Sequence, residues 1–109
     1  MLKLRTMPRT PQRLELLYFL GCPSWRLAAE RLSEATTRFG LPIEHRLVTT
    51  DEEAQRVSFR GSPTILIDGV DPFVAGDEPI GLSCRLYLTP DGYAGSPTLK
   101  QIAAVLGGE

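Results

Sequence analysis

Cys22 has the clearest chemical potential in the chain, because it lies between an apolar run and a helical pattern in LLYFLGCPSWRLAAERL, residues 16–32. Pro23 suits the first turn of a helix, so Cys22 is predicted at or beside a helix N-terminus. Backbone N–H groups and the helix dipole stabilise a thiolate there, and cysteine pKa values fall from about 8.5 to roughly 3.5–7.5 at comparable sites. The sequence therefore predicts a nucleophilic thiol.

The second cysteine of a C-x-x-C motif is missing. Trp25 stands three residues after Cys22, and Ser24 is one position too early to give C-x-x-S. In a dithiol enzyme the second cysteine releases the mixed disulfide that the first one forms. Three interpretations remain open: a monothiol enzyme that relies on an external thiol, an atypical pair with Cys84, or a scaffold whose cysteine no longer reacts.

Length and charge narrow the class of protein. A chain of 109 residues with 42% hydrophobic residues suits a single globular domain. Its net charge of −1 does not favour nucleic acid or an anionic membrane as a partner. The apolar run 14–20 is too short to cross a bilayer, and no signal-peptide cleavage site follows it. We therefore expect a cytoplasmic protein, in which two cysteines suggest thiol chemistry or metal binding.

Periodicity and turn residues divide the chain into a basic arm and one domain. Residues 1–13 show neither helical nor strand periodicity and are predicted to be a flexible N-terminal arm, and the domain covers 14–107. The domain is predicted to contain, in order, a buried strand (14–20), a helix (23–39), a strand (43–48), a helix capped by Thr50 (51–58), a strand (64–68), a loop (69–83), a strand (84–88) and a helix opened by Ser96 and Pro97 (96–106).

This order of elements, with Cys22 at the first strand–helix junction and Ser-Pro-Thr at 62–64, resembles the minimal thioredoxin fold over residues 14–107. SPTILIDGVDPF and LSCRLY resemble a group of small bacterial thioredoxin-family proteins with a degenerate C-x-x-C motif, some of them labelled alkylmercury lyase. The resemblance implies an α/β fold in which a four-stranded mixed sheet, ordered second, first, third, fourth strand, has helices on both faces.

The resemblance also implies a substrate site. Pro63 would be cis and would pack beside the sulfur of Cys22, and the backbone of Ser62 would pair with an extended substrate. Ser62, Pro63, Thr64 and Trp25 are therefore the substrate-binding candidates. Trp25 could shield the sulfur or stack on a ligand, or it could be a core residue.

Cys84 is a possible resolving cysteine, but simple topology argues against it. If the fourth strand runs parallel to the first, Cys84 lies at the end of the sheet away from Cys22. A strand of about five residues spans roughly 17 Å, whereas a disulfide needs Cα atoms within about 7 Å. We therefore expect a buried strand cysteine, unless the preceding loop folds differently.

Other polar and aromatic residues give weaker predictions. A metal site built from Cys22, Cys84 and His45 would need three distant strands to converge, and no metal-ligand spacing is present, so neither a metal nor a cofactor is expected. Arg60 could bind an anionic substrate such as glutathione, or be solvated. Tyr87 could border the site, or be a half-buried sheet residue. Asp68 and Asp71 fit turns better than an acid pair.

The leading hypothesis is a monomeric thiol-dependent oxidoreductase that uses Cys22 as a single nucleophile toward a low-molecular-weight thiol or a protein thiol. The alternative is a non-catalytic module that binds a peptide or a soft metal such as mercury through the same residue. A third possibility, a purely structural domain, predicts that Cys22→Ser changes no assayed property.

Overall fold

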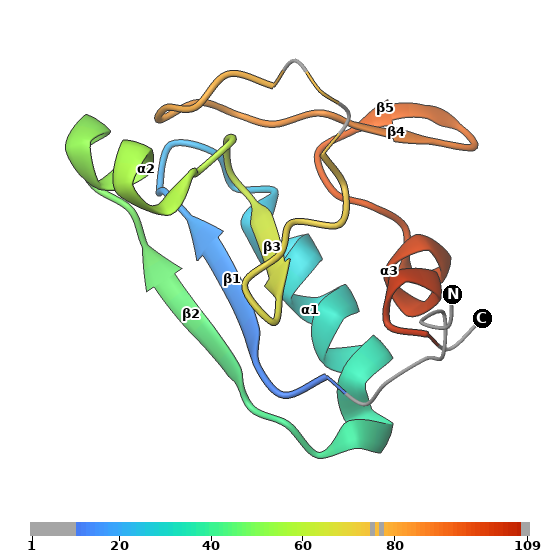
Figure 1. The fold of residues 1–109 in the computed structure, drawn as a ribbon. Helices are drawn as coiled ribbons and strands as arrows, with labels where there is room; N and C mark the ends of the chain where they lie inside the picture. Colours follow the sequence, from blue (N-terminus) through green and yellow to red (C-terminus); the bar gives the residue numbers. More distant parts are fainter. Residues whose placement is uncertain (1–10, 75, 77, 108–109) are drawn as a thin grey trace, which may run out of the picture.

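The computed structural model describes residues 11–74, 76 and 78–107, so residues 1–10 of the predicted arm lie outside the described part. Within it the chain is a mixed α/β fold (Figure 1). Its elements are β1 (Leu14–Tyr18), α1 (Trp25–Thr36), the 3₁₀ turn η2 (Thr37–Phe39), β2 (Ile43–Leu47), α2 (Asp51–Val57), β3 (Thr64–Ile67), β4 (Tyr87–Thr89), β5 (Gly92–Ala94) and α3 (Leu99–Val105).

The main sheet has three strands in the order β2-β1-β3. β1 pairs with β2 in parallel and with β3 in antiparallel orientation. Four of the five β1 residues are buried, as predicted for a strand covered on both faces. Because β1 and β3 are antiparallel, the end of β1 lies beside the start of β3, and the pair Leu17–Thr64 brings the two predicted site segments together.

Helices cover both faces of this sheet. Leu16 belongs to the larger core, which packs against α1 and α3, whereas Leu17 belongs to a smaller core beside α2. Neighbouring residues of a strand point to opposite faces, so the leucines of β1 supply both cores. The fully buried partners in the smaller core are Val48, Ala54 and Phe59.

The helix boundaries follow local capping chemistry. Thr50 accepts a hydrogen bond from the backbone N–H of Glu53, which confirms the predicted cap of α2. α3 begins later than predicted: Thr98 is its N-cap and forms a reciprocal capping box with Gln101. The longest helix, α1, has 12 residues, and no helix in the described part has the length and apolar character needed to cross a membrane.

The predicted four-stranded sheet is wrong. The fourth strand forms a separate two-stranded sheet, in which β4 pairs antiparallel with β5. The reason lies in the path of the segment between β3 and β4. It does not fold back along β3 but returns to the end of the sheet where β1 finishes, and it crosses above that end (Figure 1).

Candidate functional site

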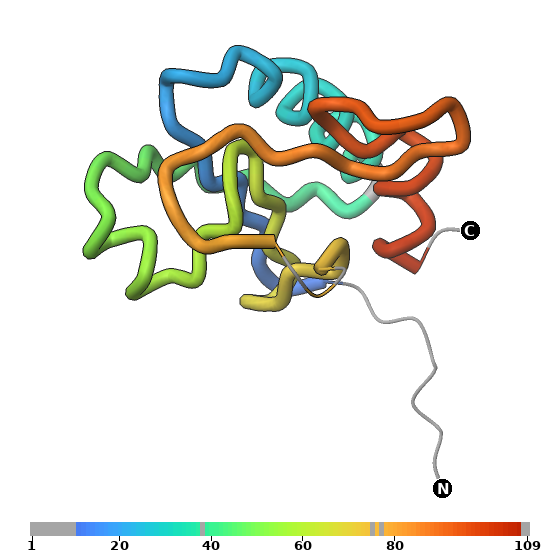
Figure 2. Tube along the Cα trace, turned by 90° about the horizontal axis from the view of Figure 1, so that it is seen from above, coloured from blue at the N-terminus to red at the C-terminus, as the bar shows by residue number. Residues whose placement is uncertain are grey.

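Cys22 and Cys84 form a disulfide, with their Cα atoms 5.7 Å apart. The expectation that topology keeps them apart is therefore wrong. It assumed that the fourth strand starts near the end of β3, whereas Cys84 forms a parallel bridge with Ser62, just before the start of β3. Seen from above, the orange segment that contains Cys84 runs beside the yellow-green stretch leading into β3 (Figure 2).

Residues 83–85, called the strap below, occupy both backbone polar groups of Ser62. The N–H of Ser62 donates to the carbonyl of Ser83 at 2.7 Å, and the N–H of Arg85 donates to the carbonyl of Ser62 at 3.1 Å. The bond between Ser62 and Pro63 is cis, as the resemblance implied. The chain's own strap thus takes the pairing position that was predicted for an extended substrate.

The two cysteines differ in exposure. Cys22 is only 2% exposed, whereas Cys84 is exposed, so the prediction of a buried strand cysteine at position 84 is wrong. The cause is the alternation of an extended chain: Arg85, Tyr87 and Thr89 are buried, and the residues between them face outward. The sulfur of Cys84 therefore belongs to an exposed residue, and the sulfur of Cys22 belongs to a buried one.

The side chain of Arg85 anchors the strap to the interior of the protein. Its side chain is 1% exposed and forms an ion pair of 2.7 Å with Asp71, whose side chain is 10% exposed. The guanidinium also donates to the carbonyl of Phe73 at 2.9 Å and to the hydroxyl of Thr64 at 3.4 Å, and it lies over the ring of Tyr87. Its Nε is the one buried side-chain nitrogen or oxygen in the described part that has no hydrogen-bond partner.

Tyr87 borders the site, as one of its two predicted alternatives held, and Asp71 forms the predicted turn but has a second role as well. Tyr87 is buried, and its hydroxyl donates a hydrogen bond to the carbonyl of Pro63. Burial raises the pKa of this phenol, and the neighbouring Arg85 charge opposes part of that shift. Asp71 forms a local turn, accepting from the N–H of Phe73 at 3.0 Å, but it is also the counter-ion of Arg85.

Cys22 lies two residues before Ser24, the N-cap of α1. The first turn of that helix contains no acidic residue, so no negative side chain in that turn offsets the positive end of the dipole. The prediction that Cys22 sits beside a helix N-terminus is confirmed, but Pro23 lies before the N-cap and not in the first turn, where it was predicted.

Of the predicted substrate-binding residues, Ser62 pairs with Cys84 itself, and Pro63 and Thr64 follow it in the chain. Ser62, Pro63 and Thr64 are all buried, and Thr64 donates to the carbonyl of Gly61 at 2.7 Å. Trp25 is half-buried and stacks on Tyr18 with ring centroids 4.2 Å apart while also packing against the larger core. These residues support the cysteine pair, and the strap lies between Ser62 and any external partner.

A small hollow of about 200 Å³ is lined by residues that lie close to both cysteines in the sequence. Its wall is mostly apolar and includes Gly21, next to Cys22, and Leu82, two residues before Cys84. Arg60, the predicted anion-binding candidate, instead lies toward α2 and donates to the backbone carbonyl of Glu78 at 3.3 Å. The surface next to the cysteines is therefore apolar along this side.

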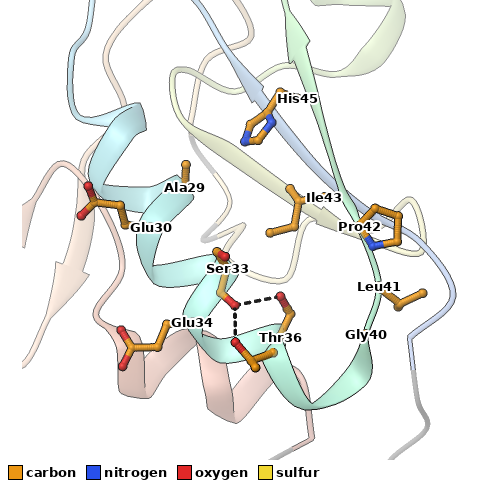
Figure 3. Close-up of a pocket in the computed structure, with 11 residues that line it drawn as sticks. Ala29, Glu30, Ser33, Glu34, Thr36, Gly40, Leu41, Pro42, Ile43 and His45 are labelled. Atoms are coloured by element: carbon orange, nitrogen blue, oxygen red, sulfur yellow. Dashed lines mark hydrogen bonds between the residues drawn. The ribbon is translucent and has the colours of Figure 1, made fainter.

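His45 lies away from the cysteines. It lines a pocket of about 680 Å³ between the C-terminal half of α1 and the edge strand β2, where Figure 3 shows Glu30, Glu34 and Ser33 on the facing helix. Among the described residues, no group of three or more His, Cys, Asp or Glu side chains could hold a metal ion. The metal arrangement of Cys22, Cys84 and His45 does not form, because only the two cysteines meet.

Sequence reasoning missed Arg85 and Asp71 as residues of the site. One signal was present: in CRLYL the residues Arg85 and Tyr87 share a face of the extended chain, so burial of one brings the other inside. Nothing local pointed to Asp71 as the partner. It lies 14 residues earlier in the chain than Arg85, beyond the reach of any strand or helix period.

Comparison with known proteins assigns no family to this chain. It matches no protein-family model, no curated protein and no solved structure. The geometry around Cys22 and Cys84 is therefore the basis for the function proposed next.

Proposed function

We propose that this protein is a thioredoxin-like thiol–disulfide oxidoreductase whose reactive pair is Cys22 and Cys84. The observation that carries the proposal is the disulfide itself, with Cα atoms 5.7 Å apart, between the start of α1 and the cis Ser62–Pro63 bond. The order of β1, α1, β2, α2 and β3 and the antiparallel pairing of β1 with β3 support a thioredoxin-like origin. The pair would replace C-x-x-C with two cysteines distant in sequence.

The proposed reaction consists of two thiol exchanges. A partner thiolate attacks the sulfur of Cys84, the Cys22–Cys84 bond breaks, and its electron pair leaves on Cys22 as a thiolate. A second partner thiolate then attacks the partner's sulfur in the mixed disulfide and releases Cys84. Two partner thiols become one disulfide, and their two protons end on the two protein thiolates. The reverse sequence reduces a partner disulfide.

Two features make Cys84 the attacked sulfur. Cys84 is exposed and Cys22 is 2% exposed, so an incoming thiolate reaches Cys84 first. A leaving thiolate departs faster when it is stabilised, and Cys22 lies beside the N-terminus of α1. This assignment differs from the hypothesis of a single nucleophile: Cys84 faces the partner, and Cys22 is the internal member of the pair.

The proposed partner is a low-molecular-weight thiol or a protein thiol, and the proposed compartment is the cytoplasm. Disulfides are rare in the cytoplasm, and those that do form there are usually transient and catalytic or redox-sensing. The apolar hollow beside Leu82 and Gly21 suits the aliphatic part of a thiol compound better than a charged group.

The pair can be tested with two single-cysteine variants. Cys22→Ser retains the exposed Cys84, which we expect to form a mixed disulfide with glutathione disulfide readily. Cys84→Ser retains the buried Cys22, which we expect to react at least about tenfold more slowly, as shielded thiols do. Intact mass spectrometry over time measures both rates, and the two variants serve as each other's control.

The midpoint potential of the wild type decides between exchange and a permanent crosslink. In glutathione or dithiothreitol buffers we expect the Cys22–Cys84 pair to titrate above about −270 mV, within the range of oxidoreductases, together with turnover of a small disulfide. A midpoint below about −300 mV, where structural disulfides lie, and no turnover would show that the bond is a staple.

A second candidate function has support from the same contact. Once reduced, two cysteines at this spacing offer two thiolate ligands, which suit a soft metal ion such as Hg²⁺. Equilibrium binding of one Hg²⁺ per reduced chain, clearly weaker in either single-cysteine variant and accompanied by no disulfide turnover, would favour a binding module over the enzyme.

A further inference from the structure

The strap has the arrangement of a partner peptide that the chain supplies to itself. Its backbone pairs with both polar groups of Ser62, on either side of Cys84, and Cys84 is bonded to Cys22. An extended peptide in a mixed disulfide with Cys22 would need the same backbone pairing and the same sulfur position. The folded chain therefore leaves no room on Ser62 for an external strand.

Three attachments of the strap do not depend on the disulfide. Arg85 forms its ion pair with Asp71 in the interior, and Tyr87 donates to the carbonyl of Pro63. The third attachment is the backbone pairing with Ser62. Loss of one member of a buried ion pair costs several kcal/mol. These contacts therefore hold the strap more firmly than a short exposed segment is usually held.

Gly61 shows how closely the strap lies. It adopts φ +107°, and a Cβ at this position would stand 2.9 Å from the Cβ of Arg85 and 3.2 Å from the carbonyl oxygen of Ser83. Real Cβ atoms essentially never approach another heavy atom within 3.0 Å. The strap therefore rests directly on the backbone that precedes Ser62.

We propose that Arg85, Asp71 and Tyr87 form a latch that keeps the strap on Ser62 after the disulfide is reduced. Cys84 then remains the sulfur that faces the partner, and Cys22 stays covered in both redox states. The three are positioning residues, because they act through the strap and do not touch the partner. The consequence for catalysis depends on the proposed exchange function, whereas the latch itself can be measured without it.

The latch restricts the class of partner. An extended peptide cannot use the backbone of Ser62 while the strap is in place, so a partner must reach Cys84 from the outer surface with its own thiol. A small thiol can do this, and so can a cysteine on a protruding protein surface. Docking by strand addition at Ser62 requires the latch to open first.

The experiment measures the accessibility of Cys22 in the full chain carrying Cys84→Ser, where no disulfide can form. The rate of Cys22 alkylation by iodoacetamide is followed by mass spectrometry, with the urea-unfolded chain as the reference for a free thiol. We expect the folded variant to react at least about tenfold more slowly than the unfolded chain, because the strap still covers Cys22.

Adding Asp71→Asn removes the charge opposite Arg85 and should accelerate Cys22 alkylation by about tenfold or more, in line with the cost of breaking a buried ion pair. Asp91→Asn is the matched control, since it makes the same chemical change at an exposed residue of the β4–β5 turn, and its rate should not change. Tyr87→Phe removes one hydroxyl and should give a smaller acceleration. Circular dichroism verifies that each variant is folded.

The latch is refuted if Cys22 in the Cys84→Ser chain reacts as fast as in the unfolded chain, because the strap then leaves as soon as the disulfide is absent. Equal rates for Asp71→Asn and Asp91→Asn refute it as well. If Asp71→Asn does not fold, Tyr87→Phe decides, and an unchanged rate there counts against the latch. Failure of the exchange function would appear only in the turnover and potential of the wild type.

Discussion

At the level of single residues, Tyr87 links the strap to the start of β3. Its hydroxyl donates to the carbonyl of Pro63, and its ring meets Phe73 edge to face at 5.6 Å. Burial raises the pKa of Tyr87 above its ordinary value of about 10, the Arg85 charge lowers it in part, and the Asp71 carboxylate adds to the rise. The neutral phenol is therefore favoured in the folded protein over the whole physiological range.

This shift predicts a loss of stability in alkali. Above about pH 10 the unfolded chain releases the Tyr87 proton while the folded chain keeps it, so the free energy of unfolding falls as pH rises. The release of this one proton lowers the free energy of unfolding by about 1.4 kcal/mol per pH unit. Urea denaturation between about pH 9 and pH 11 should show that the free energy of unfolding falls less steeply with pH in Tyr87→Phe than in the wild type.

Tyr93→Phe is the matched control for that measurement, since Tyr93 is 71% exposed, and its pH slope should equal that of the wild type. Equal slopes for Tyr87→Phe and the wild type would contradict the assignment. At neutral pH, Tyr87→Phe should also cost about 1–3 kcal/mol, because the Pro63 carbonyl loses its donor in the interior.

At the level of elements, the site depends on the contact of the strap with the stretch before β3. A parallel bridge joins Cys84 to Ser62, and the N–H of Gly81 donates to the carbonyl of Phe59 at 3.0 Å. These contacts guide the chain across the end of the sheet before it continues into β4 (Figure 2). The absence of a side chain at Gly61 is what permits the approach.

Gly61→Ala tests this approach, with Gly92→Ala as a control that has nearly the same φ. The two glycines have φ +107° and +106°, but a Cβ at Gly92 meets nothing within 4 Å. Both variants carry the cost of an unfavourable φ, about 1 kcal/mol or more. Only Gly61→Ala must also displace the strap, so we expect a clearly larger loss of stability in urea denaturation. Combined with Cys84→Ser, which leaves Cys22 as a free thiol, it should also give faster alkylation of Cys22 than Gly92→Ala in the same background. Equal losses would show that the close approach does not matter.

At the level of the whole molecule, the disulfide joins two residues 62 positions apart and ties the start of α1 to the strap. A crosslink over a loop of this length stabilises a fold by about 4 kcal/mol in the chain-entropy account. In an exchangeable pair part of that gain is offset, because the reduced folded protein stabilises the thiolate of Cys22 beside α1. The reduced chain should therefore remain folded through its two cores.

Urea denaturation with and without reductant measures this difference. We expect reduction to lower the free energy of unfolding by less than about 4 kcal/mol and to leave the far-ultraviolet circular dichroism unchanged. The double variant Cys22→Ser with Cys84→Ser lacks both the crosslink and the thiolate, so its stability should lie below that of the reduced wild type. Unfolding on reduction alone would indicate a structural staple.

The sequence by itself determined the local elements and one half of the site. The apolar run of β1, the Thr50 cap of α2 and the placement of Cys22 before α1 follow from patterns within a few residues. Such patterns depend on strand and helix periods and on capping hydrogen bonds, which are local and so can be predicted from sequence.

Only the tertiary structure decided where Cys84 lies and what holds it there. The path from β3 to Cys84 is set by contacts between distant residues, chiefly Asp71 with Arg85 and Ser83 with Ser62. Strand and helix periods do not predict such pairs, because the local sequence around each of these residues is compatible with either a loop or a strand. The two-residue alternation that exposes Cys84 and buries Arg85 was readable from the sequence, but the surface against which this segment packs was not. Packing against that surface brings Cys84 to Cys22, so the cysteine that was predicted to act alone is one of a pair.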